Sequence, residues 1–185
     1  TFSIATNVGE EFWDRLNAGT EILIIDGLLT MELVYPVAPL HCRNLFVLSI
    51  NMGCYISTAF VLCLPPHFSE LYVDCGSVDE YGVDFSSLVF LTHLRLSACG
   101  IEDVSGFVFP NRAFYLDLSF NCFDLSGLRG VDKILGLSLR YCALVGLACY
   151  EFPRSLGELN LSKTGLTDLS ELRDLPFRLR FLNLS

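Results

Sequence analysis

The sequence predicts an α/β repeat fold: a curved, horseshoe-like solenoid with a parallel β-sheet on its concave side and a mostly irregular or 3₁₀ convex side. Three observations predict it. A pattern of the form L-x-x-L-x-L-x-x-C-x-I recurs along the chain, and its clearest copy is Leu91–Ile101, LTHLRLSACGI. Units of this pattern begin at residues 19, 45, 68, 91, 113, 134, 156 and 179, so consecutive starts lie 21 to 26 residues apart. Hydrophobic residues make up 52% of the chain and charged residues 18%, as expected when stacked repeats merge their apolar positions into one core.

Residues 1–18 precede the repeats, and we expect them to form a short amphipathic helix. Asn7 and Glu10 have the spacing of a capping box at a helix N-terminus. Three apolar residues then share one helical face: Phe12, Trp13 and Leu16. This helix is either an N-terminal cap or the end of a preceding repeat.

Residues 19–185 are predicted to form the solenoid, with seven full repeats and a truncated eighth. In the first unit, Ile22 and Ile24 take the inward strand positions, which places Leu23 on the outward face. The second unit contains an uncharged stretch, residues 45–64, that is about as long as a membrane-spanning helix. Because this stretch keeps the repeat spacing, we prefer a strand followed by a buried return, with a transmembrane helix as the alternative.

From residue 87 onward the units are shorter and resemble the short, Sds22-like class of leucine-rich repeats, L-x-x-L-x-x-L-x-L-x-x-N-x-I-x-x-I-x-x-L. One matching unit contains Leu88, Leu91, Leu94, Leu96, Cys99, Ile101, Val104 and Phe107, and a second contains Leu156, Leu159, Leu161, Thr164, Leu166, Leu169, Leu172 and Leu175. The resemblance covers residues 87–185 well and the earlier half loosely. It implies a curved solenoid with a binding role. Asparagine occupies the ninth position only at Asn121, so an unbroken asparagine ladder is not expected.

Charge and cysteine usage restrict the function. The formal net charge of −9 argues against a protein that tracks nucleic-acid phosphates and against docking on anionic membranes. Eight cysteines are present, and Cys99 and Cys142 take the ninth position of their units, where a small side chain is buried. Cysteines used as small buried hydrophobes favour a reducing compartment, and we therefore expect a cytoplasmic protein.

Side chains alternate along a strand, so the residues between the repeat leucines are expected to line the concave face. Across the middle repeats these positions gather aromatic and charged side chains, which are typical of protein-binding hot spots. The alternative is a solvated face with incidental aromatic residues. The predicted partner-binding residues are Tyr72, Asp74, His93, Arg95, Tyr115, Asp117, Phe120, Arg140 and Tyr141.

Catalytic and metal sites are not predicted. His93, Asp117 and a column of serines could be drawn as a triad, but serine is a common filler of repeat strands and no nucleophile-turn motif accompanies it. Cys63 and His67, with Cys54 or Cys42, lack the paired spacing of a zinc site. We therefore expect no enzyme activity, cofactor or metal.

The predicted function is a protein-interaction scaffold or adaptor that presents its concave face to a protein partner. The alternative is the ligand-recognition repeat region of a receptor or larger enzyme. Because Leu182 and Leu184 end the chain on the strand of a new unit, we expect further repeats or a partner to cover that edge.

Overall fold

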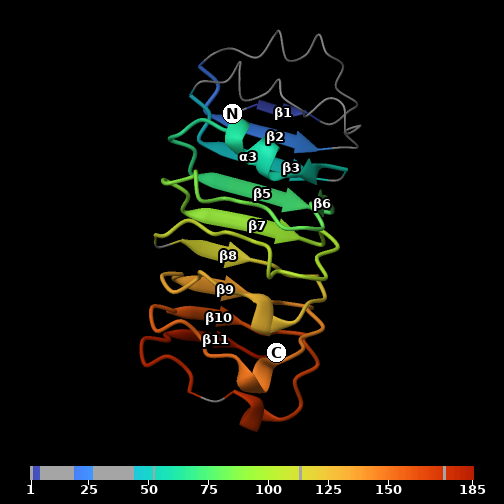
Figure 1. Ribbon diagram of the computed structural model, residues 1–185, viewed down its shortest axis with the longest axis vertical. Coiled ribbons are helices and arrows are strands. Elements are labelled where there is room, and N and C mark those ends of the chain that lie inside the picture. Colours follow the sequence, from blue (N-terminus) through green and yellow to red (C-terminus); the bar gives the residue numbers. More distant parts are fainter. Residues whose placement is uncertain (1, 5–18, 27–43, 52, 113, 173) are drawn as a thin grey trace.

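Parallel strands stacked like rungs form the body of the protein (Figure 1). The computed structural model describes residues 2–4, 19–26, 44–51, 53–112, 114–172 and 174–185. Within them, nine strands pair in one sheet in the order β1-β2-β3-β5-β7-β8-β9-β10-β11, and every pair is parallel. The strands are β1 (Phe2–Ile4), β2 (Ile22–Asp26), β3 (Val47–Asn51), β5 (Glu70–Asp74), β7 (His93–Ser97), β8 (Tyr115–Asp117), β9 (Gly136–Ser138), β10 (Glu158–Asn160) and β11 (Phe181–Asn183). The predicted parallel solenoid is confirmed.

The return segments opposite this sheet contain little regular structure. A second parallel pair joins β4 (Tyr55–Ile56) to β6 (Ser77–Val78). The α-helix α3 (Thr58–Cys63) begins at Ser57, whose hydroxyl accepts from the Phe60 N–H at 3.2 Å. In the described residues of the later returns, the helical segments are of the 3₁₀ type: η1 (Leu125–Gly127), η2 (Leu147–Cys149) and η3 (Leu169–Glu171). The helical half of an α/β repeat is thus limited to α3 in the described part of the chain.

The core lies between the sheet and these returns, and its leucines form columns. Leucines follow one another in register on successive strands and are all buried: Leu48, Leu71, Leu94, Leu116, Leu137 and Leu159. A row of phenylalanines lies in the same core, with ring centroids 6.0–6.3 Å apart between successive members: Phe85, Phe107, Phe109 and Phe114. No single unit could bury these side chains, so each rung depends on its neighbours. At the last rung, Leu182 and Leu184 are each 38% exposed.

The first unit has a different register from the one that the sequence predicts. Leu23 lies opposite Leu48 in the sheet and is fully buried, while Ile24 lies opposite Ser49. The prediction that Ile22 and Ile24 point inward is therefore wrong by one residue. The reason is that residues 22–25 are apolar at every position, so alternation cannot choose between the two faces there.

Two further expectations concern the N-terminal half. The expected helix in residues 1–18 lies almost wholly outside the described residues, and the part that is described, β1, is a strand paired with β2. Residues 45–64 contain β3, β4 and α3, as predicted for a strand and a buried return. Across the parts of the chain that the structure describes, no helix has both the length and the apolar character needed to span a bilayer.

The strands β5, β7, β8, β9 and β10 are each followed by a tight turn in which one residue adopts the left-handed conformation. In successive units this position has φ between 52° and 61° although none of its residues is glycine: Cys75, Ala98, Phe120, Tyr141 and Lys163. Such a conformation disfavours residues with a Cβ, so the turn is held by its surroundings. Asn121, at the next position of its unit, accepts at Oδ1 from the N–H groups of Cys99 (3.0 Å) and Ile101 (3.1 Å) in the preceding unit.

Candidate functional site

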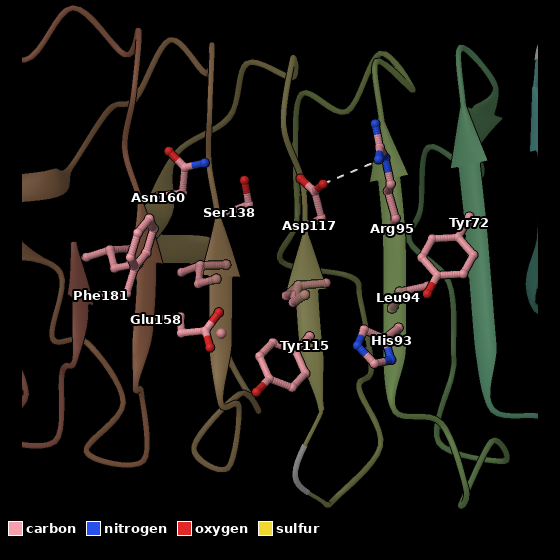
Figure 2. Close-up of a pocket in the computed structure, with 14 residues that line it drawn as sticks. Tyr72, His93, Leu94, Arg95, Tyr115, Asp117, Ser138, Glu158, Asn160 and Phe181 are labelled. Atoms are coloured by element: carbon pink, nitrogen blue, oxygen red, sulfur yellow. Dashed lines mark ion pairs between the residues drawn. The ribbon is translucent and has the colours of Figure 1, made fainter. Parts of the chain in front are cut away.

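The outer face of the long sheet, which is the face turned away from the core, carries a shallow hollow of about 290 Å³ (Figure 2). Its lining side chains come from β5 and from every strand between β7 and β11. They project outward because side chains alternate along each strand. The floor is the strand backbone at Leu94, Leu116, Leu137 and Leu159, whose side chains are buried in the core. We call this feature the sheet-face hollow.

Strand β9 gives the sheet-face hollow its depth. Its two outward residues are Gly136 and Ser138, and both are smaller than the outward residues of the neighbouring strands β8 and β10. Gly136 lies in register between Tyr115 on β8 and Glu158 on β10. A Cβ at Gly136 would collide with the Tyr115 ring, so the ring leans over the glycine. Glycine in a strand interior often marks such a close approach.

A row of aromatic rings forms one rim of the sheet-face hollow. The His93 and Tyr115 rings are stacked, with centroids 5.1 Å apart and planes within 8°. Tyr72 donates from its hydroxyl to Glu70 at 2.8 Å. Burial, together with the hydrogen bond to this carboxylate, raises the pKa of Tyr72 to about 12. Tyr72 is therefore a neutral hydrogen-bond donor at neutral pH, and Glu70 is held by it.

An ion pair forms the other rim. Arg95 Nε lies 2.9 Å from Asp74 Oδ1 and 3.7 Å from Asp117 Oδ2, so the guanidinium bridges two carboxylates on either side of it (Figure 2 shows the Asp117 contact). Asp117 is fixed further because its Oδ1 accepts from the backbone N–H and the hydroxyl of Ser119. These partly exposed pairs contribute little to stability, but they hold the rim in one arrangement.

A second cluster lies beyond the strand ends, where the chain turns. The Phe120 and Tyr141 rings are stacked at 4.7 Å and are 47% and 45% exposed. The Arg140 guanidinium lies 5.9 Å from the Phe120 ring centroid and 5.1 Å from that of Tyr141. Both aromatic residues have the left-handed backbone described above. Two aromatic side chains are thus displayed to solvent from strained positions.

The nine predicted binding residues therefore fall into two groups. Six belong to the rims of the sheet-face hollow or pair with them: Tyr72, Asp74, His93, Arg95, Tyr115 and Asp117. The other three form the turn cluster: Phe120, Arg140 and Tyr141. The sequence prediction did not include Gly136, Glu158 and Phe181, which also line the hollow. A glycine at a strand position that other units fill with a large side chain was the signal that could have revealed them.

The arrangements considered for catalysis and metal binding are not assembled in the described residues. His93 contacts Thr92 at 3.1 Å and Glu70 at 4.0 Å, whereas Ser119 and Ser138 share a hydrogen bond of 2.9 Å with each other. No group of three or more His, Cys, Asp and Glu side chains in the described parts is arranged to hold a metal ion.

Two of the buried cysteines, Cys99 and Cys142, serve as weak donors to the backbone. The Cys142 thiol donates to the Leu118 carbonyl at 3.2 Å, and the Cys99 thiol donates to that of Ser97 at 3.4 Å. All seven cysteines in the described part of the chain are free thiols. Cysteine thus takes the place that asparagine takes at position 121.

Comparison of the chain with models of known protein families and with curated protein sequences finds no match.

Proposed function

We propose that this chain is the repeat region of a leucine-rich-repeat protein that binds a protein partner on the outer face of its sheet. One observation carries the proposal: side chains from β5 and β7 to β11 meet around one hollow, and those of His93, Tyr115 and Arg95 are already held in place before a partner arrives. The Asn121 contacts support the repeat class, because they tie two units together from the ninth position.

Preorganisation is the physical basis of this binding role. The His93–Tyr115 stack and the Arg95 ion pairs fix side chains that otherwise lose rotamer freedom on association. Immobilising such a side chain costs about 0.5–1.5 kcal/mol, so a rim that is ordered in advance lowers the cost of binding. Tyrosine and arginine are also the residue types that dominate binding energy at protein interfaces.

A reducing, cytoplasmic setting belongs to the same proposal and is supported by the free thiols that donate to backbone carbonyls. A secreted receptor fragment, the alternative considered from the sequence, would instead hold its cysteines in disulfides.

Affinity capture tests the binding role. The double variant Tyr115→Ala, Arg95→Ala removes both rims, and we expect it to lose proteins that the wild type recovers. The double variant Tyr81→Ala, Arg129→Ala makes the same two changes at exposed positions in the return segments and should recover them unchanged. If all three baits recover the same proteins, the outer face of the sheet is not the binding surface.

A further inference from the structure

In the part of the sheet-face hollow above β9, four side chains of different chemistry flank the strand: Tyr115, Asp117, Glu158 and Asn160. Gly136 lies in register between Tyr115 and Glu158, and Ser138 lies in register between Asp117 and Asn160. Because β9 contributes almost no side-chain volume, the four flanking side chains line the hollow at this level, and the Tyr115 ring covers part of Gly136. Tyr115 and Glu158 flank Gly136 from the two neighbouring strands, and Figure 2 shows both side chains on this face of the sheet.

One of these four side chains carries a negative charge without a partner. Glu158 is exposed and has no hydrogen bond or ion pair to its side chain within the described residues. The nearby Asp117 differs, since it is already engaged by Ser119 and Arg95. Glu158 is therefore the carboxylate in the hollow that is available to a cation. The formal net charge of −9 adds a general attraction for basic partners.

The side chain on the other flank of β9 offers an aromatic face in a fixed position. Tyr115 is held on one side by its stack against His93, and on the other side its ring overhangs Gly136. An aromatic face attracts a cation placed within about 6 Å of its centroid. Ring and carboxylate together thus match a group that is flat, positively charged and rich in hydrogen-bond donors.

We propose that the hollow above β9 binds an arginine side chain of a protein partner, with the guanidinium against the exposed Tyr115 ring and hydrogen-bonded to the Glu158 carboxylate. A guanidinium stacks on an aromatic ring and donates two parallel hydrogen bonds to a carboxylate, whereas an ammonium group does neither in the same planar way. The inference rests on the proposed function and specifies the chemistry of the partner.

Titration with the capped tripeptide Ac-Gly-Arg-Gly-NH₂, followed by ¹H–¹⁵N NMR at physiological salt, tests the assignment. We expect the largest shifts at the backbone amides of Tyr115, Gly136 and Glu158, and weaker binding of Ac-Gly-Lys-Gly-NH₂. Glu158→Gln keeps the size of the side chain and removes its charge, and it should weaken arginine binding about fivefold. Glu80→Gln removes the same charge at an exposed position in a return segment and should leave binding unchanged.

Three results would overturn the arginine site: equal binding of the lysine peptide, shifts spread evenly over the acidic surface, or equal affinity of the two glutamate variants. The capture experiment is independent of this titration. Loss of partners in the Tyr115→Ala, Arg95→Ala variant, without site-specific arginine binding, would leave the binding role standing and refute only the arginine assignment.

Discussion

Asn121 offers the sharpest test of how the repeats hold together. Its amide is buried and spans two units: Oδ1 accepts from the N–H groups of Cys99 and Ile101, and Nδ2 donates to the carbonyls of Leu96 (2.8 Å) and Leu118 (2.9 Å). The Asn121→Ala variant removes all of these bonds. It is expected to weaken the joint between the unit of β7 and the unit of β8 while leaving the leucine columns intact.

The size of the effect follows from the groups left without a partner. Two buried backbone N–H groups lose their acceptor, and each such loss costs about 1–3 kcal/mol. We therefore expect the free energy of unfolding to fall by about 2–6 kcal/mol. Asn121→Cys should lie between wild type and Asn121→Ala, because a thiol can still donate to a carbonyl, as Cys142 does, but accepts only weakly.

Urea unfolding followed by circular dichroism gives the free energy, and hydrogen exchange of the Cys99 and Ile101 amides gives a local measurement. The local measurement matters because solenoids often unfold in parts rather than in one step. Asn111→Ala removes an exposed asparagine side chain and serves as the matched control. If Asn121→Ala and Asn111→Ala agree within about 0.5 kcal/mol and both amides stay protected, the joint does not depend on this amide.

Three further predictions concern the turns, the hollow and the thiols. Ala98→Gly should stabilise the protein by about 0.5–1 kcal/mol because φ is 52° there, whereas Ala148→Gly in η2 should destabilise it, and urea unfolding of both variants checks the opposite signs. Gly136→Ala displaces the Tyr115 ring and should abolish arginine-peptide binding with little loss of stability, as measured by NMR titration and thermal unfolding. Burial raises three thiol pKa values above the ordinary 9.0, to about 12, about 12 and about 11, at Cys54, Cys99 and Cys142 respectively. The folded thiols stay neutral where the unfolded ones ionise, so stability is full below about pH 9 and declines as pH rises toward about 12, which urea unfolding at about pH 8 and pH 10 would reveal.

The repeat spacing was enough to predict the parallel solenoid because the inward positions are nearly invariant in chemistry. From Leu48 to Leu159, every strand places a leucine at the same register position, and one choice of face buries all of them. The alternation of apolar and polar residues gave no answer where successive residues of a strand are all apolar. In β2 the run of apolar residues satisfied both faces, and the structure selected the one that sets Leu23 against Leu48.

The candidate site was predictable only in part, for a related reason. Alternation placed Tyr72, Arg95 and Asp117 on one face, and their register confirms that they are neighbours. It could not predict that Phe120 and Tyr141 lie past the strand ends with positive φ, because a side-chain pattern does not report backbone dihedral angles. The prediction also selected large side chains and therefore overlooked Gly136, the glycine that gives the hollow its depth.

In a solenoid of this kind, a specific binding surface requires outward strand residues that differ in size or charge from one unit to the next. The inward leucines must repeat, since stacking fails if one unit does not match the next, whereas the outward residues are free to vary. The two small residues of β9 lie next to the bulky His93–Tyr115 stack, and the sheet-face hollow is deepest there. The contacts of Tyr115 with His93 and of Asp117 with Arg95 hold one wall in place, which lowers the ordering cost for a side chain that enters. The absence of a side chain at Gly136 is thus as specific a feature of this surface as the aromatic rings around it.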